Sequence, residues 1–63
     1  MRLNSSAISE VEYNPASRHL KIRFKDSKWY DFVGVPESIY QGLISASSAG
    51  TYYHNHIEGR YQS

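Results

Sequence analysis

The feature that most constrains the fold is a change of hydrophobic period near Gly34. Before this residue, apolar and charged residues alternate, which is the pattern of half-buried strands. After it, Pro36 and Glu37 suit the first turn of a helix, because proline is tolerated there and an acid favours the positive end of the helix dipole. A sheet followed by helices indicates an α+β fold.

Three antiparallel strands are expected before this change, around residues 10–13, 19–25 and 29–33. The first turn begins at Asn14 and Pro15, since asparagine bonds to nearby backbone and proline fixes φ. In the first hairpin, pairing Val11 with Ile22 buries one face and places acids opposite cations on the other. These charged pairs are Glu10 with Arg23 and Glu12 with Lys21.

The second hairpin leaves two registers to compare. A three-residue loop over residues 26–28 pairs Ile22 with Phe32 and sets Arg23 opposite Asp31. A two-residue turn would place Asp31 on the apolar face, where desolvation of the carboxylate is costly. The sequence therefore favours the three-residue loop.

Two short helices are expected after Pro36, both on one face of the meander, in the order βββαα. Gly42 weakens the first helix by about 1 kcal/mol relative to alanine, so packing must hold it. The second helix starts with Ser47 or Ser48 as its N-cap, and Gly59 is its C-terminal stop. The predicted core is Val11, Tyr13, Leu20, Ile22, Phe24, Tyr30, Phe32, Ile39, Tyr40, Leu43, Tyr53 and Ile57.

The composition predicts one small domain over residues 1–63, with residues 1–5 loosely ordered. A chain of this length buries only about 60% of its unfolded surface. It has no cysteine, so no disulfide can stabilise the fold. Seven Lys/Arg against six Asp/Glu give a net charge of +1, too balanced to imply nucleic acid by composition alone. The chain shows no apolar run long enough for a membrane span or a signal peptide, so we expect a cytoplasmic protein.

A set of positions spread along the chain forms a recognisable pattern. Its members are Tyr13, Leu20, Ile22, Phe24, Tyr30, Phe32, Val35, Pro36, Tyr40, Ala46, Ser48, Gly50, Tyr52, Tyr53, Ile57 and Tyr61. With this pattern, the chain from about residue 6 to residue 61 resembles the KTSC family. That family is a short domain found at the C-terminus of some lysyl-tRNA synthetases and as free-standing bacterial and phage proteins. The resemblance implies no established activity, and its link to a synthetase suggests RNA.

The chain departs from that family's pattern at three positions. A central Tyr-x-Tyr becomes Tyr30-Asp31-Phe32, so one hydroxyl is missing. His54 stands where relatives carry asparagine, and Glu58 where they carry a basic residue. The last two departures fall in the helical segment that a basic surface would use.

A basic segment is the strongest candidate for a binding site. Five of the seven cations lie within eleven residues, with Asp26 as the only acid among them. In the favoured register Trp29 shares a sheet face with three of them. Such a face can hold single-stranded nucleic acid, because phosphates meet cations and bases stack on the ring. The candidate residues are Arg18, Lys21, Arg23, Lys25, Lys28 and Trp29.

The same register supports a second interpretation without a ligand. Acids opposite Lys21 and Arg23 would make a solvated cross-strand charge ladder, worth roughly 0.2–1 kcal/mol per pair. Only Arg18, Lys25 and Lys28 would then remain unpaired, near the strand ends.

Two further motifs contain residue types that bind phosphate or metal ions. Ser48 and Gly50 could hold a phosphate at the start of the second helix, or could serve as a helix cap and a close packing contact. His54 and His56 are two residues apart on a helix and point to different faces, so we expect no metal site.

The sequence carries no catalytic constellation, since it lacks a cysteine nucleophile, a nucleophile elbow and a phosphate-binding glycine loop. It therefore predicts a non-enzymatic binding module without a cofactor, a metal or a membrane partner. The favoured ligand is nucleic acid, most of all RNA. The alternative is a protein partner bound through an exposed strand edge or an aromatic patch.

Overall fold

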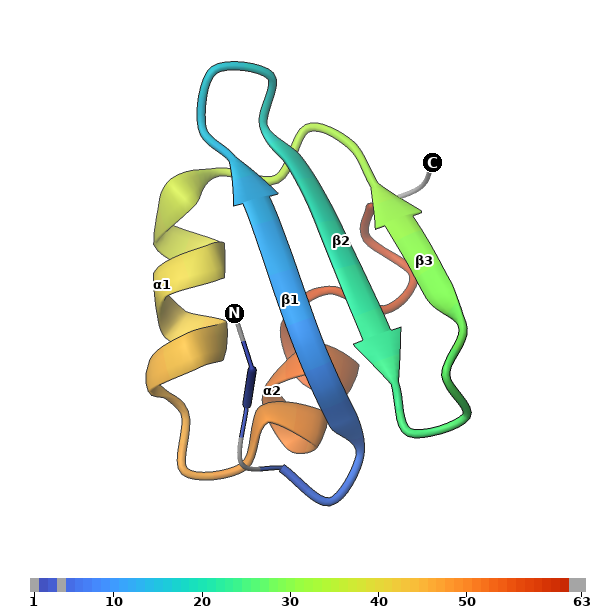
Figure 1. The fold of residues 1–63 in the computed structure, drawn as a ribbon. Coiled ribbons are helices and arrows are strands. Elements are labelled where there is room, and N and C mark those ends of the chain that lie inside the picture. Colours follow the sequence, from blue (N-terminus) through green and yellow to red (C-terminus); the bar gives the residue numbers. More distant parts are fainter. Residues whose placement is uncertain (1, 4, 62–63) are drawn as a thin grey trace.

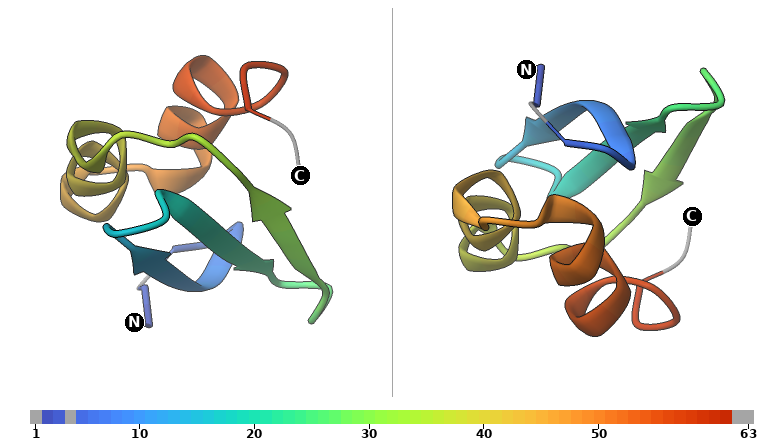
Figure 2. Two further views of the ribbon diagram at one scale, coloured as in Figure 1. Left: turned by 90° about the horizontal axis from the view of Figure 1, so that it is seen from above. Right: turned by 90° about the horizontal axis from the view of Figure 1, so that it is seen from below.

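The computed structural model describes residues 2–3 and 5–61 of the chain (Figure 1). Three strands form one antiparallel sheet in the order β1-β2-β3, and two helices follow. Viewed from above and from below, both helices cover the same face of the sheet (Figure 2). The predicted α+β arrangement, βββαα, is therefore confirmed. The elements are β1 (Ile8–Asn14), β2 (His19–Phe24), β3 (Trp29–Phe32), α1 (Glu37–Ser45) and α2 (Ala49–His56).

The first hairpin has the predicted register. Val11 pairs with Ile22, and Glu10 and Glu12 lie opposite Arg23 and Lys21. The turn is closed by the side chain of Asn14, whose Oδ1 accepts a hydrogen bond of 3.0 Å from the backbone N–H of Ala16. The charge pattern and the turn chemistry thus agree on one pairing.

The predicted register of the second hairpin is wrong by two residues. Ile22 pairs with Tyr30 rather than with Phe32, and Arg23 lies opposite Trp29 rather than Asp31. A shift of two residues preserves the side-chain alternation, so each side chain stays on the sheet face that was predicted for it.

The turn chemistry explains this shift. The loop occupies residues 25–27, one residue earlier than expected, because Phe24 donates to the Lys28 carbonyl at 3.2 Å. The carboxylate of Asp26 accepts the Lys28 N–H at 3.0 Å. Ser27 takes the left-handed conformation, with φ of 72°, that closes a three-residue hairpin loop.

The helix ends follow the predicted signals. Pro36 precedes α1, and Glu37 lies in its first turn. Ser48 caps α2, where its Oγ accepts a hydrogen bond of 3.3 Å from Thr51 N. Gly59 follows α2 with φ of +78°, a conformation that glycine adopts without strain. The described residues contain no helix long and apolar enough to cross a membrane.

The core lies between the sheet and the helices. Six of the predicted core residues are buried, and five more pack against the core while partly exposed. Tyr30 was wrongly assigned to the core, because 44% of it is exposed. The sequence interpretation missed Ile8, Val35 and Ala49, all of which are buried. The full buried set is Ile8, Val11, Leu20, Ile22, Phe32, Val35, Leu43, Ala49 and Ile57.

The N-terminal segment follows the free side of β1. Arg2 forms an isolated antiparallel bridge with Glu10, and Leu3 donates to the Ser9 carbonyl at 3.0 Å. Leu3 also packs against the core. Residues 1 and 4 of the segment that we expected to be loosely ordered lie outside the described residues.

Candidate binding surfaces

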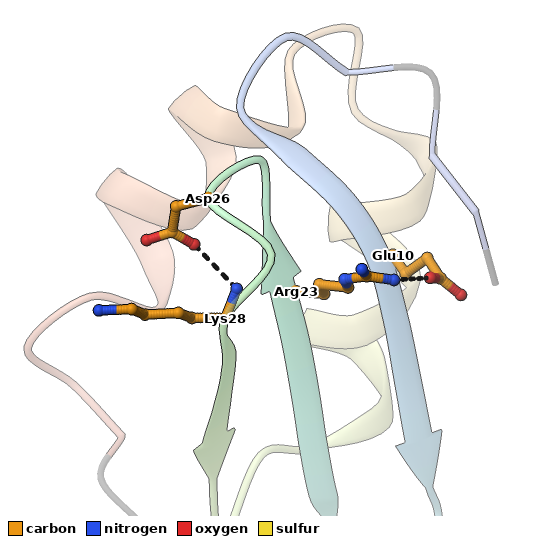
Figure 3. A network of polar contacts seen from close by, with 4 residues as sticks. All are labelled: Glu10, Arg23, Asp26 and Lys28. Carbon is orange, nitrogen blue, oxygen red and sulfur yellow. Dashed lines mark hydrogen bonds and ion pairs between the residues drawn. The ribbon is translucent and has the colours of Figure 1, made fainter.

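The outer face of the sheet, which points away from the helices, carries three of the six residues of the predicted nucleic-acid site: Lys21, Arg23 and Trp29. Arg23 lies at its centre, with Glu10 across from it on β1 and Trp29 across from it on β3. Figure 3 shows the Arg23 side chain reaching toward Glu10, with 2.9 Å between Nη1 and Oε1. The Nε of Arg23 is buried and has no hydrogen-bond partner among the described residues. The guanidinium charge is therefore matched by a carboxylate of the same sheet.

Lys21 also has acidic neighbours. It is exposed and lies between Glu12 on β1 and Asp31 on β3. The Asp31 carboxylate oxygen Oδ1 lies 3.1 Å from His19 Nε2 as well. Acids thus flank Lys21 in the register, and among the described residues the Lys or Arg of the ladder that forms an ion pair within 4.0 Å is Arg23, with Glu10.

The remaining cations of the predicted site do not gather in one place. Arg18 lies in the β1–β2 turn, whereas Lys25 and Lys28 lie at the β2–β3 turn. These two turns are at opposite ends of β2, roughly 23 Å apart at about 3.3 Å of rise per residue. The Lys28 side chain extends away from Arg23 (Figure 3). The structure thus brings Arg23 and Trp29 together, and it leaves Arg18 far from the lysines of the other turn.

Both residues of the candidate phosphate site make contacts within the chain. Ser48 Oγ donates to Thr51 Oγ1 at 3.0 Å in addition to accepting the Thr51 N–H. A Cβ added to Gly50 would lie 3.0 Å from the Cβ of Ala7, so α2 approaches the start of β1 closely at this glycine. A helix cap and a packing contact account for both residues.

The two histidines of α2 have separate environments. His54 Nδ1 lies 2.7 Å from Glu58 Oε1, one turn further along the chain. The His56 ring packs against Tyr52, with 4.3 Å between centroids. Within residues 2–3 and 5–61, no three His, Asp or Glu side chains gather where they could hold a metal ion.

The exposed apolar side chains lie on β3 and directly after it. Within the described part of the chain, the large hydrophobic residues that are exposed are Trp29 at 41%, Tyr30 at 44% and Val33 at 50%. The β1 edge is covered in part by the bridge from Arg2, whereas β3 is the outer strand on the other side. We call Trp29, Tyr30, Asp31 and Val33 the β3 surface.

An open hollow adjoins the β3 surface on the helix side of the sheet. Its volume is about 470 Å³, and three aromatic rings line it. Phe24 is the central ring, with centroids 5.4 Å from Tyr30 and 5.0 Å from Tyr53 in edge-to-face contacts. Lys25, Asp26 and Glu58 also line it, together with Ala7. The sequence interpretation missed this hollow, because it placed Tyr30 in the core.

The Tyr53 hydroxyl belongs to this hollow. Burial raises the pKa of Tyr53 above its ordinary value of 10.0, and the charge of Glu58 and the neighbouring Tyr30 raise it further. The phenol is neutral at physiological pH already at its ordinary pKa, so with Phe24 and Tyr30 it presents an aromatic wall to a ligand.

Comparison with known proteins identifies the relatives of this chain. A sequence profile of the KTSC domain matches residues 4–61. A protein of Tsukamurella paurometabola is 30% identical over 61 residues, which cover 97% of this chain and 91% of that protein. In structure, the chain is similar to a KTSC domain protein from Yersinia pestis, with a TM-score of 0.93 and 34% identity, over 97% of this chain and 86% of that one.

The chain is also similar to part of a much longer protein. A lysine–tRNA ligase of a Nostoc species is 27% identical over 62 residues, which are 98% of this chain but only 11% of the ligase. A lysine–tRNA ligase of Trichormus variabilis matches over the same lengths.

Proposed function

The chain belongs to the KTSC domain family, and we propose that it is a small non-enzymatic binding module that holds a protein partner on the β3 surface. The observation that carries this proposal is the position of the exposed apolar side chains. Trp29 and Tyr30 lie on β3 and Val33 directly follows it, and no other strand of the described residues pairs with the outer edge of β3. Exposed apolar residues on an open edge are a feature of strands that pair with a partner.

The charges of the sheet support a protein partner over a polyanion. Arg23 is neutralised by Glu10, and Lys21 lies between two acids. Nucleic-acid affinity comes largely from cations that displace counterions from phosphates. A cation that is already paired contributes less to that exchange.

RNA is the second candidate ligand. Trp29 lies opposite Arg23, and the exposed Lys25 and Lys28 are close to it in sequence, so a base could stack on the ring while phosphates meet the lysines. Two relatives of this chain are lysine–tRNA ligases, of which it spans 11%.

An amide NMR titration of the labelled protein separates the two candidates. The additions are tRNA, mixed-sequence single-stranded RNA, and a pool of capped six-residue peptides with alternating apolar and polar residues. Each is tested at about 50 and about 200 mM salt, because only phosphate contacts are strongly salt-dependent. We expect the peptide pool to shift residues 29–33 at both salt concentrations.

A matched pair of variants shows whether those shifts report the β3 surface. Trp29→Ala removes the largest exposed side chain of the surface, and Gln41→Ala changes an exposed residue of α1. The first should abolish the peptide response, and the second should leave it intact. RNA-induced shifts at Arg18, Lys25 and Lys28 that shrink at the higher salt, without a response to peptides, would overturn the proposal in favour of RNA.

A further inference from the structure

We propose that the β3 edge binds an extended peptide segment of a partner protein as a fourth, antiparallel strand, with a basic residue opposite Asp31 and an apolar residue seated in the aromatic hollow. This inference rests on the proposed function and specifies the chemistry of the partner. It follows from the backbone of β3, from the alternation of side chains across its edge, and from the charge at its centre.

The backbone of β3 directs hydrogen-bonding groups to the open edge, where a further strand could pair. The hydrogen bond from Phe24 N to Lys28 O makes these two residues a hydrogen-bonded pair. Such pairs alternate along an antiparallel ladder, so Tyr30, opposite Ile22, directs its N–H and C=O toward β2. Trp29 and Asp31 direct theirs to the open edge. An added strand can therefore form ladder bonds at these two residues.

The side chains of the added strand would alternate between the two faces. The residue opposite Tyr30 would point to the helix side, where Phe24, Tyr30 and Tyr53 line the hollow of about 470 Å³. A leucine-sized side chain fits such a space and would cover the exposed half of the Tyr30 ring. The hairpin end of β3 extends beyond the helices, which leaves this approach open (Figure 2).

The other face selects a basic residue. Asp31 lies on the outer face, and its side chain is 47% exposed although it contacts His19. A lysine or arginine directly opposite would form a cross-strand pair of opposite charge, and an acid there would be repelled. Two acids, Asp26 and Glu58, and one cation, Lys25, line the hollow. Its charge therefore also favours a basic partner segment.

A second copy of the chain fits this edge poorly. Self-pairing about Asp31 would place two carboxylates directly opposite each other, which is destabilising. β3 has four residues, and so short an edge suits weak binding of a peptide segment rather than a stable dimer, whose interface buries roughly 1,200 Å² or more. A charge on a short edge strand is a usual device against self-association.

The experiment uses a defined probe, the capped peptide acetyl-Thr-Thr-Arg-Leu-Thr-Thr-amide. In the antiparallel register its arginine lies opposite Asp31 and its leucine opposite Tyr30. Amide NMR titration to about 2 mM peptide covers the weak affinity expected of a short segment. We expect saturable shifts at Trp29, Tyr30 and Asp31, and at Tyr53 in the hollow.

Two altered peptides separate backbone pairing from side-chain contact. Methylation of the backbone nitrogens of the arginine and of the threonine after leucine removes both ladder donors and should weaken binding by about tenfold or more. Replacing arginine by glutamate should also weaken binding. The Asp31→Lys variant should reverse that charge preference and bind the glutamate peptide better.

A matched pair of protein variants tests the edge itself. Asp31→Asn removes the charge and keeps the N–H, whereas Asp31→Pro removes the N–H that faces the open edge, where proline is tolerated. The proline variant should bind more weakly than the asparagine variant. If the proline variant does not fold, the methylated peptide still tests the ladder.

Two results would overturn the inference in different ways. Equal binding of the methylated and unmethylated peptides would exclude strand addition and leave protein binding at the β3 surface standing. No shift with this peptide or with the peptide pool would overturn both proposals, and RNA-induced shifts at Lys25 and Lys28 would then favour the nucleic-acid candidate.

Discussion

The substitution Gly42→Ala should destabilise the domain, although alanine is the better helix former. Gly42 lies in the middle of α1, and a Cβ there would come within 2.5 Å of Cζ and 2.8 Å of Cε2 of Tyr52 on α2. Helix propensity would stabilise the variant by about 1 kcal/mol, and overpacking typically costs about 1–3 kcal/mol. Moving the Tyr52 ring away would also disturb its contact with His56. We therefore expect a net loss of about 1 kcal/mol.

The assays are urea unfolding and thermal unfolding, each monitored by far-ultraviolet circular dichroism. A loss of 1 kcal/mol corresponds to a fall in Tm of about 4–8 °C for a domain of this size. Gln41→Ala is the matched control, since Gln41 is the exposed neighbour of Gly42 and its replacement should change stability by less than about 0.5 kcal/mol.

A double-mutant cycle isolates the contact between the two helices. In a Tyr52→Ala background the three atoms nearest to the added Cβ are removed, so Gly42→Ala should stabilise the protein by up to about 1 kcal/mol. The reasoning fails if Gly42→Ala stabilises the protein with Tyr52 in place, or if it has the same effect in both backgrounds.

Three further tests address the core, the charge ladder and the hollow. Ile22→Ala should cost about 2–5 kcal/mol, since Ile22 is fully buried, and an unchanged melting temperature would refute this core assignment. A double-mutant cycle on Glu10 and Arg23 should give about 0.2–1 kcal/mol of coupling that declines with salt, and zero coupling at low salt would contradict the ladder. Because the Tyr53 pKa is raised in the fold, stability should be full below pH 10.0 and fall as pH rises above it. Tyr53→Phe should flatten that fall in urea unfolding, and an identical pH profile would refute it.

The first hairpin could be predicted because burial and charge specify the same register. Pairing Val11 with Ile22 satisfies both faces, and the structure shows that pairing. In the second hairpin burial and charge do not discriminate between the two registers. A shift of two residues leaves every side chain on the same sheet face and still sets Asp31 opposite a cation. The local turn decided the register, through the Asp26 side chain and the left-handed backbone of Ser27.

The binding surfaces could be predicted only in part. The basic segment is evident in the sequence, but whether its cations are free depends on the cross-strand acids that the fold brings to Lys21 and Arg23. The exposure of Tyr30 depends on how far the helices extend over β3, which no local pattern encodes. An open strand edge was expected, and the structure identifies it as β3 because Arg2 bridges to β1.

Amide hydrogen exchange along β3 tests the central claim most directly, because it reports which backbone groups face the open edge. The structure predicts slow exchange at Tyr30 and Phe32, and fast exchange at Trp29 and Asp31 that slows when the arginine–leucine peptide binds. The reverse pattern in the free protein, with Trp29 and Asp31 protected and Tyr30 and Phe32 exchanging fast, would contradict the register. It would also remove the edge on which the proposed strand addition depends.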